Sequence, residues 1–311
     1  MKRYFPGEKK LDPSSTAPLD RGPVEFKSRI SEHPGDVMKI ATRNVVSVPP
    51  TTTIMGAAKT MTKYGFRRLP VVDAGSRRLM GIVSTMDIID FFGGGNRYNL
   101  VKNKYGGNLL AAINEEVREI MEENVITITE YYSIKEALET LRERNVGALP
   151  IVNDENQLIG IVTEKDFVFM ASEVESFDIF VYECMTRDVR SVRPSVKIRD
   201  ASKEMIQRGF RRLPVVEDGI LVGILTASDI VRYLSTGEAF SKLVTGNIDE
   251  ALNVPVSEIM SKEVVFISSD VDIAEAARVM MKHDIGALPV IDGDELVGII
   301  TERDFIKAMR V

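Results

Sequence analysis

Apolar residues recur with the same spacing in four segments of the chain. In each segment they stand at positions i, i+3 and i+7, which places them on one face of a helix. The four sets are Ile54/Ala57/Met61, Ile134/Ala137/Leu141, Ile198/Ala201/Met205 and Ile273/Ala276/Met280. Each is followed by Leu-Pro and two β-branched residues, at 69–72, 149–152, 213–216 and 288–291, a run that predicts a buried strand. The chain therefore contains four copies of one structural unit.

The second half of each unit also repeats. After the Leu-Pro strand come a polar turn, a second strand that contains glycine, and then Ser or Thr followed three residues later by Asp. Because Ser and Thr are favoured immediately before a helix, this last element marks a helix start. We predict strand, helix, strand, turn, strand and helix in every unit, a mixed α/β (α+β) fold of tandem β-α-β-β-α repeats.

The four repeats are of two alternating types. Repeats one (36–92) and three (181–234) share Gly-Phe-Arg-Arg-Leu-Pro-Val-Val at 65–72 and 209–216. Repeats two (117–172) and four (256–311) instead share Gly-Ala-Leu-Pro and Thr-Glu-Lys/Arg-Asp-Phe. One repeat cannot bury both its helix face and its sheet face, so we expect pairs. The pairs are module one, 36–172, and module two, 181–311, and an approximate two-fold axis is expected to relate the two repeats within each module.

Composition and charge exclude several classes of protein. The 311 residues are 44% hydrophobic and 28% charged, and no apolar run approaches the length of a membrane span. The net charge of −6 gives no general attraction for nucleic acid. One cysteine and two histidines build neither a disulfide framework nor the usual zinc site. With no signal peptide visible, we expect a cytoplasmic protein without a metal.

Residues 1–35 match no repeat. They hold five of the thirteen prolines, with basic and acidic residues interleaved. We interpret them as a partly disordered N-terminal arm. A basic tail that binds nucleic acid is the alternative, and the interleaved acidic residues argue against it.

The Leu-Pro strand, the glycine strand and the Ser/Thr-x-x-Asp helix start, repeated at this spacing, resemble the cystathionine β-synthase (CBS) domain family in four tandem copies. The resemblance implies that two repeats pack through their sheets into a Bateman module with two clefts, and that two modules stack into a disc. It also implies adenosine-containing ligands in the clefts, namely AMP, ADP or ATP, with S-adenosylmethionine as an alternative. The layout is similar to that of the γ subunit of AMP-activated protein kinase.

The Ser/Thr-x-x-Asp element has two interpretations. Capping explains it structurally, because a hydroxyl and a carboxylate at a helix start both pair with free backbone amides. The functional interpretation is that the carboxylate accepts hydrogen bonds from the two ribose hydroxyls of a nucleotide. The presence of Asp in all four copies, where a capping box usually has Glu or Gln, favours the second. The candidate nucleotide-binding residues are Ser84, Asp87, Thr163, Asp166, Thr226, Asp229, Thr301 and Asp304.

Arginine pairs stand just before the Leu-Pro strand in repeats one and three. A guanidinium group offers bidentate donors to a phosphate, whereas a solvated ion pair at a rim is the structural alternative. The resemblance to the CBS domain family implies that basic residues at this position often contact nucleotide phosphates. The candidate phosphate-binding residues are Arg67, Arg68, Arg211 and Arg212, with Lys165 and Arg303, which precede the Asp of repeats two and four. We expect Arg67 and Arg211 to reach across from the paired repeat.

No residue pattern indicates catalysis. Cys184 precedes a repeated methionine and is expected to be a small buried hydrophobe, and His283 an ordinary residue at a helix C-terminus. No phosphate-binding loop of the Gly-Lys-Ser/Thr type is present, and the repeats leave no room for a catalytic barrel. We therefore expect a non-enzymatic sensor that signals through module geometry to an unknown effector protein, with a homodimer possible. The alternatives are an adaptor with empty clefts and, less favoured, an enzyme of the IMP dehydrogenase or pyrophosphatase type.

Overall fold

The computed structural model describes residues 2–3 and 30–309 of the chain. The predicted disordered arm falls mostly on residues 4–29, outside the described residues. Its last part, from residue 30 onward, contacts repeat two, where the amide of Lys135 donates to the carbonyl of Ser31 at 3.1 Å. Ile30 packs against the core of the same region.

Every repeat has the predicted order of helix, strand, strand and helix. The elements are α2 (Ile54–Tyr64), β2 (Arg68–Val72), β3 (Leu79–Ser84) and α3 (Thr85–Gly93) in repeat one; α6 (Ile134–Glu143), β5 (Ala148–Val152), β6 (Leu158–Thr163) and α7 (Glu164–Ser172) in repeat two; α9 (Ile198–Arg208), β7 (Arg212–Glu217), β8 (Ile220–Thr226) and α10 (Ala227–Ser235) in repeat three; α12 (Ile273–His283), β10 (Ala287–Asp292), β11 (Glu295–Thr301) and α13 (Glu302–Ala308) in repeat four. The twelve apolar residues that define the predicted helix faces are all buried, which confirms the helical pattern.

Shorter elements lead into the repeats and connect them. They are β1 (Lys2–Arg3), α1 (Val37–Ile40), α4 (Tyr98–Tyr105), α5 (Leu109–Ala112), β4 (Ile128–Thr129), α8 (Val181–Cys184), α11 (Ile248–Leu252) and β9 (Val265–Phe266), with 3-10 turns at Val117–Glu119, Ala239–Lys242 and Val256–Glu258. The connectors within the two modules meet each other, because Asn108 and Asn247 form an antiparallel bridge.

The predicted first strand is regular in only part of the chain. In repeat two it is β4, parallel to β5, whereas in repeats one and three a single parallel bridge stands in its place, Val48 to Val71 and Val192 to Val215. The backbone hydrogen bonds are nevertheless equivalent, since the carbonyl of the Leu-Pro proline accepts from the leading segment, as Pro70 does from Val48 at 3.0 Å. Proline lacks an amide but keeps this acceptor, so it fits the strand.

Leading segments cross between the two repeats of a module. Thr42, ahead of repeat one, bridges Ile161 of β6, and Glu122, ahead of repeat two, bridges Ile82 of β3. Module two repeats the exchange, with Thr186 bridging Ile299 and Ser261 bridging Ile224. The glycine of the second strand has a packing reason, because a Cβ at Gly81 would lie 2.7 Å from the sulfur of Met121. Methionines fill the space beside the strand glycine in repeats one, three and four, whereas Gly160 of repeat two faces Ile151 and the carbonyl of Thr42.

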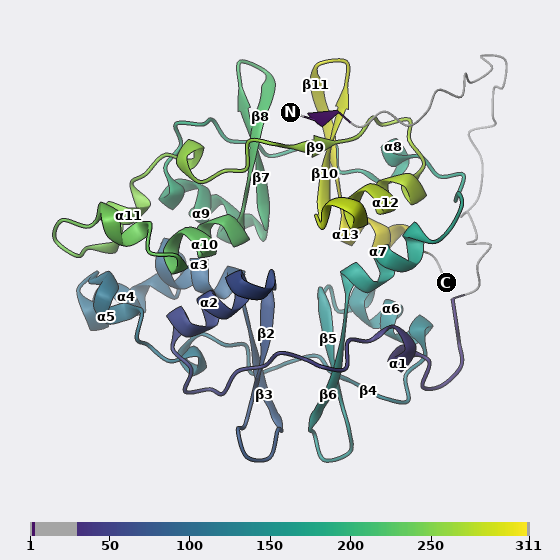
Figure 1. Ribbon diagram of the computed structural model, residues 1–311, viewed down its shortest axis with the longest axis horizontal. Coiled ribbons are helices and arrows are strands. Elements are labelled where there is room, and N and C mark those ends of the chain that lie inside the picture. Colours follow the sequence, from purple (N-terminus) through teal and green to yellow (C-terminus); the bar gives the residue numbers. More distant parts are fainter. Residues whose placement is uncertain (1, 4–29, 310–311) are drawn as a thin grey trace.

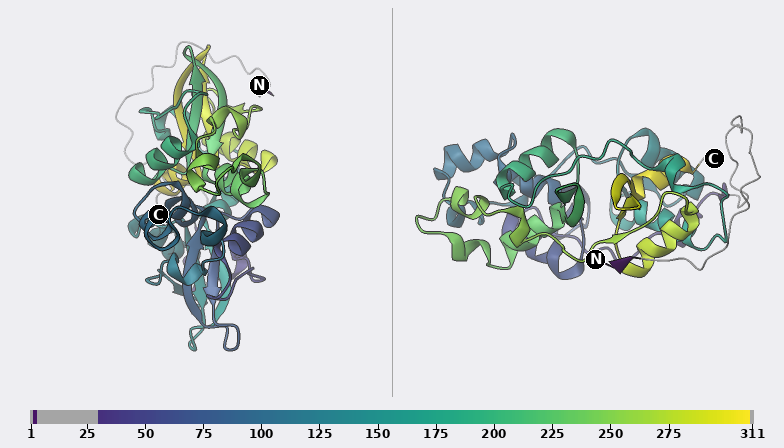
Figure 2. Two further views of the ribbon diagram at one scale, coloured as in Figure 1. Left: turned by 90° about the vertical axis from the view of Figure 1, so that its left-hand side faces the viewer. Right: turned by 90° about the horizontal axis from the view of Figure 1, so that it is seen from above.

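The two large hydrophobic cores run between the modules, whereas a small third cluster, Leu221, Val264, Phe266 and Ile291, lies within module two. One cluster joins the helices of repeats one and three, including Phe91, Phe92, Tyr233 and Leu234. A second joins repeats two and four, including Phe167 and Phe305. Figure 1 shows the four hairpins extending outward from the centre, with helices between the upper and lower pairs, and Figure 2 shows that the molecule is flattened. Sheets thus pair repeats within a module, whereas helices hold the modules together.

This division of contacts gives a prediction about module one alone. A chain of residues 36–172 would expose the faces of α3 and α7 that module two covers, so we expect it to self-associate. Light scattering coupled to size exclusion should give a mass of at least twice the monomer. A monomeric fragment that melts at the temperature of the full chain would contradict this view of the cores.

Candidate functional site

The hairpins bring the two sequence motifs to the same end of each repeat. In the antiparallel register, Ser84 pairs with Arg68 and Thr226 with Arg212. In the other two repeats, Thr163 pairs with Ala148, and Thr301 with Ala287. These ends point toward the middle of the molecule, and the turns lie at its rim (Figure 1). The helix starts and the residues before the Leu-Pro strands therefore surround one central region.

All four aspartates form capping contacts. One oxygen, Oδ2, accepts from the backbone amide and from the hydroxyl of the Ser or Thr three residues earlier; the amide distances are 2.8 Å for Asp87, 2.7 Å for Asp166, 2.8 Å for Asp229 and 2.8 Å for Asp304. The structural interpretation of the motif is therefore correct. It accounts for only one oxygen of each carboxylate.

The second carboxylate oxygen divides the repeats into two groups. In repeats one and three it is already engaged, since Oδ1 of Asp87 is paired with Arg97 and Oδ1 of Asp229 with Arg232 at 2.7 Å. In repeat four the nearest basic group to Oδ1 of Asp304 is 3.8 Å away, on Lys307. Among the described residues, Oδ1 of Asp166 has no hydrogen bond or ion pair.

The two carboxylates without a close basic partner, Asp166 and Asp304, have a raised pKa in common. Burial raises the pKa of both above the ordinary value for aspartate, although their hydrogen bonds oppose this shift. A buried carboxylate with a free oxygen gains more from a hydrogen-bonded ligand than a solvated one does.

The first arginine of each Arg-Arg pair, Arg67 or Arg211, forms an ion pair across the centre with the diagonally opposite repeat. Arg67 of repeat one forms a bidentate pair with Glu302 of repeat four, and Nη2 to Oε1 measures 3.0 Å. Arg211 of repeat three contacts Glu164 of repeat two at 2.9 Å. The expectation that these side chains reach into the paired repeat of their own module therefore needs correction. Their ionic partners are in the other module, because the helix starts of all four repeats converge at the centre.

The arginine side chains explain why repeats one and three have Arg-Arg where repeats two and four have Gly-Ala. A Cβ at Gly147 would lie 2.8 Å from Nη2 of Arg68, and a Cβ at Gly286 would contact Arg67. Arg212 donates to the carbonyl of Gly286. Repeats two and four therefore lack a side chain where arginines of repeats one and three need the space.

The charged forms of Arg68 and Arg212 are disfavoured by their surroundings. Burial and the neighbouring Arg211 lower the pKa of Arg68 to about 10. Burial and Arg67 lower the pKa of Arg212 to about 9. An anion placed among these groups would relieve the repulsion.

The other two basic candidates also cross between modules. Arg303 of repeat four donates to Glu164 at 2.9 Å, to the carbonyl of Val146 at 2.8 Å and to Asn145. Lys165 of repeat two pairs with Asp284 of repeat four at an exposed position. All six predicted basic residues thus belong to the central region.

The sequence reasoning missed the acidic members of this region, Glu164, Glu302 and Asp284. A signal was present, because the residue after the capping Thr is Glu in both repeats of the second type. Six basic side chains face these three acids, so these nine side chains together carry three more positive than negative charges. We call this set of nine side chains the central cluster.

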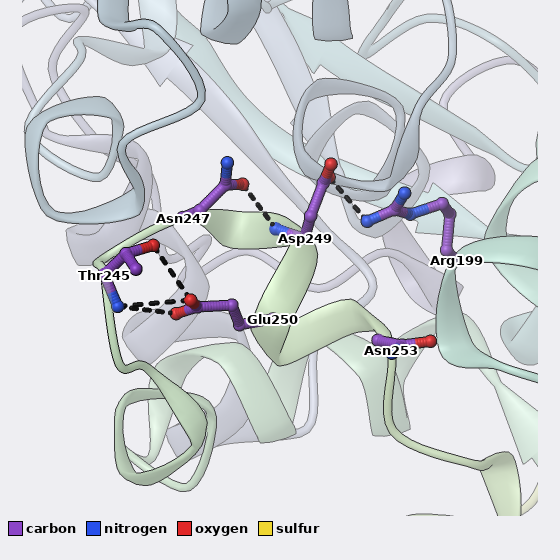
Figure 3. Close-up of a pocket in the computed structure, with 6 residues that line it drawn as sticks. All are labelled: Arg199, Thr245, Asn247, Asp249, Glu250 and Asn253. Carbon is purple, nitrogen blue, oxygen red and sulfur yellow. Dashed lines mark hydrogen bonds and ion pairs between the residues drawn. The ribbon is translucent and has the colours of Figure 1, made fainter.

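A separate cavity lies away from the central cluster. It is bordered by α9 and by the connector around α11, and its lining residues are Arg199, Thr245, Asn247, Asp249, Glu250 and Asn253 (Figure 3). Its charged side chains pair with other side chains of the same chain. Arg199 pairs with Asp249, which also accepts from Tyr98 at 2.6 Å, and Glu250 accepts from Thr245. These bonds hold the connectors together, so we assign the cavity no ligand.

Two further sequence expectations concern isolated reactive residues. Cys184 packs against the second core cluster, and burial raises the pKa of its thiol to about 11, which makes it a poor nucleophile. His283 is the exposed last residue of α12, as expected. Within the described part of the chain, no group of three His, Cys, Asp or Glu side chains could hold a metal ion. None of its helices is long and apolar enough to cross a membrane.

Comparison with known families identifies all four repeats. The profile described as the CBS domain matches residues 35–94, 117–173, 181–236 and 256–311. The chain belongs to the CBS domain family. Its CBS repeats take up nearly all of the chain from residue 35 onward, which makes it a CBS-domain protein of the regulatory type, and no catalytic domain is matched.

Several relatives resemble the chain over most of its length. The uncharacterized protein MJ1225 of Methanocaldococcus jannaschii is 47% identical over 273 residues, which cover 87% of this chain and 98% of that protein. Its crystal structure, described as that of a proposed archaeal homologue of γ-AMPK, superposes with a TM-score of 0.84 over 88% of this chain and all of the other. An uncharacterized 33.4 kDa protein of Thermofilum pendens is 30% identical, covering 83% of this chain and 86% of the relative. The four-repeat CBS architecture is thus confirmed.

Proposed function

We propose that this CBS-domain protein is a non-catalytic sensor of adenosine nucleotides, AMP, ADP or ATP. The ribose would bind at the starts of α7 and α13, and the phosphates would lie toward the central cluster. The observation that carries the proposal is the second carboxylate oxygen of Asp166 and of Asp304, beside a region with an excess of positive charge. Among the described residues that oxygen is unpaired in Asp166, and in Asp304 it has only the 3.8 Å ion pair with Lys307. An acceptor for two hydroxyls next to arginine donors matches the two ends of a nucleotide.

The ribose role is assigned to two of the four aspartates. Asp87 and Asp229 already use their second oxygen on Arg97 and Arg232, so a ribose would have to displace an ion pair there. We therefore propose two nucleotide sites per chain. The sequence alone left open how many of the four clefts bind a ligand.

Two alternatives belong to other classes of ligand or function. S-adenosylmethionine has a ribose but carries a positive sulfonium group, which the arginines of the central cluster would repel. An adaptor with empty clefts would leave Arg68 and Arg212 close to other arginines, with only Glu164 and Glu302 to offset their charge. The charge of the central cluster favours an anionic nucleotide over both.

The route from ligand to partner is also part of the proposal. The contacts of Arg67, Arg211 and Arg303 join one module to the other, so phosphates that recruit these arginines would alter the contact between modules. An effector protein that binds across both modules would detect that change. A homodimer and a cytoplasmic location remain predictions.

Calorimetry with AMP and the full chain tests the proposal. We expect two AMP molecules per chain and a rise in melting temperature with AMP concentration, because a ligand that prefers the folded state stabilises it. Four molecules per chain would overturn the assignment to repeats two and four. Absence of both binding and stabilisation by AMP, ADP and ATP would favour the adaptor.

A further inference from the structure

Two glutamates occupy the centre of the molecule in a way that capping and packing do not require. Glu164 and Glu302 are the first residues of α7 and α13, and their exposed fractions are only 1% and 2%. Acidic residues at a helix start are favourable, but they usually remain solvated. Here each one is buried against arginines from the opposite module.

The contacts of the two glutamates are those expected for a bound anion. Glu164 accepts from Arg211 through Oε2 at 2.9 Å and from Arg303 through Oε1 at 2.9 Å. Glu302 receives both terminal nitrogens of Arg67. Burial opposes ionisation of Glu164, but Arg211 and Arg68 outweigh it and hold its pKa below the ordinary value. Both carboxylates thus neutralise arginines that a phosphate would otherwise use.

The position of each glutamate relates it to one proposed nucleotide site. Glu164 stands two residues before Asp166, and Glu302 two residues before Asp304. Carboxylate and phosphate oxygens make the same bidentate contacts with a guanidinium group. An arginine that binds the carboxylate in this way therefore has fewer donors left for a phosphate.

We propose that Glu164 and Glu302 are internal competitors of nucleotide phosphates and set the preference of each site for phosphate number. The inference rests on the proposed function and names its specificity-determining residues. A nucleotide with few phosphates leaves the glutamate–arginine pairs in place. A longer phosphate chain binds by displacing a carboxylate from its arginine, and that exchange loosens a contact between the modules.

The two sites are predicted to differ in this competition. Two arginines hold Glu164, whereas one holds Glu302. The difference follows from single substitutions between equivalent positions, since Arg303 corresponds to Lys165, which pairs with Asp284 instead. Phosphates should therefore displace Glu302 more readily, and removal of the charge at position 164 should have the larger effect.

The test uses the full chain with Glu164→Gln and Glu302→Gln, which remove one negative charge while keeping the side-chain size. Glu155→Gln and Glu295→Gln are matched controls, because these exposed residues lie at the outer ends of the same two hairpins. Adenosine, AMP and ATP are titrated by calorimetry at low salt. We expect ATP affinity to rise about tenfold in the central variants, AMP affinity to rise less, and adenosine affinity to stay within error.

Inorganic tripolyphosphate separates failure of this inference from failure of the proposed function. It should raise the melting temperature of Glu164→Gln and Glu302→Gln more than that of the controls, whether or not a nucleoside binds. If nucleotides do not bind any variant and this difference persists, the nucleotide proposal fails and the competition stands. If adenosine and ATP bind with the wild-type ratio of affinities in the central variants, the competition is refuted and the nucleotide site stands.

A second pair of variants guards against loss of the fold. Glu164→Asp and Glu302→Asp keep the charge and shorten the side chain, which weakens the arginine contacts without leaving like charges unneutralised. They should show an intermediate gain in ATP affinity. A loss of ATP affinity in the folded aspartate variants would mean that the glutamates position the arginines for phosphate, which is the opposite of competition.

Discussion

Replacing Asp166 or Asp304 with alanine should lower the affinity of its site for adenosine by about 30- to 150-fold, or roughly 2–3 kcal/mol. The variant removes a charged acceptor whose second oxygen is proposed to accept hydrogen bonds from the ribose hydroxyls. The loss should be the same for adenosine, AMP and ATP, because the sugar contact does not depend on the phosphates. Calorimetric titration of the three ligands measures it.

Capping is the competing explanation, and the chain supplies its control. Asp87 and Asp229 make the same contacts with the amide and hydroxyl of their capping residues. Alanine at these positions should lower stability by about 1 kcal/mol, as for other lost caps, while leaving ligand affinity unchanged. Equal losses of affinity in all four variants would argue that the aspartates act only through helix stability.

The repeats were predictable because they rest on local rules. The i, i+3, i+7 faces, the Leu-Pro strands and the Ser/Thr-x-x-Asp helix starts all depend on residues that are close in sequence. The same rules located the basic residues of the central cluster, since the register of a hairpin follows from its turn and its pattern.

Contacts between repeats were not predictable in the same way. Arg67 and Glu302 are 235 positions apart, and periodicity shows which face of an element is buried but not what covers it. One signal for the cores between modules was present. Ile88, Ile89, Phe91 and Phe92 make α3 apolar on more than one face, and all four are buried. A helix with two apolar sides packs against two neighbours, and in repeat one the second neighbour is module two.

The partner of the second carboxylate oxygen could not be predicted from the motif either. The four Ser/Thr-x-x-Asp patterns differ in the ion pairing of their carboxylates because Arg97 lies beyond the end of α3 and Arg232 within α10. Lys307, the equivalent basic residue of α13, stays 3.8 Å away from Asp304. The motif identifies a helix start, and its surroundings determine whether an acceptor remains for a ligand.

Replacing Arg67 with alanine should destabilise the ligand-free protein by roughly 3 kcal/mol or more, because Glu302 would stay buried without its arginine. Arg211→Ala should cost less, since Arg303 still pairs with Glu164. Urea denaturation of the two variants measures the difference. Combining Arg67→Ala with Glu302→Gln should restore most of the lost stability, because the uncompensated charge is then removed.

The Arg67 variants also test whether this arginine binds the phosphates of a nucleotide. The Arg67→Ala, Glu302→Gln double variant is stable by this reasoning but lacks the phosphate donor. Relative to Glu302→Gln alone, it should lose affinity for ATP and, to a smaller extent, for AMP, while binding adenosine normally. The loss should shrink as salt is added, because part of the Arg67 side chain is solvent-accessible. If the double variant binds ATP as tightly as Glu302→Gln alone, Arg67 contributes only to the contact between modules, and the phosphates must bind elsewhere in the central cluster.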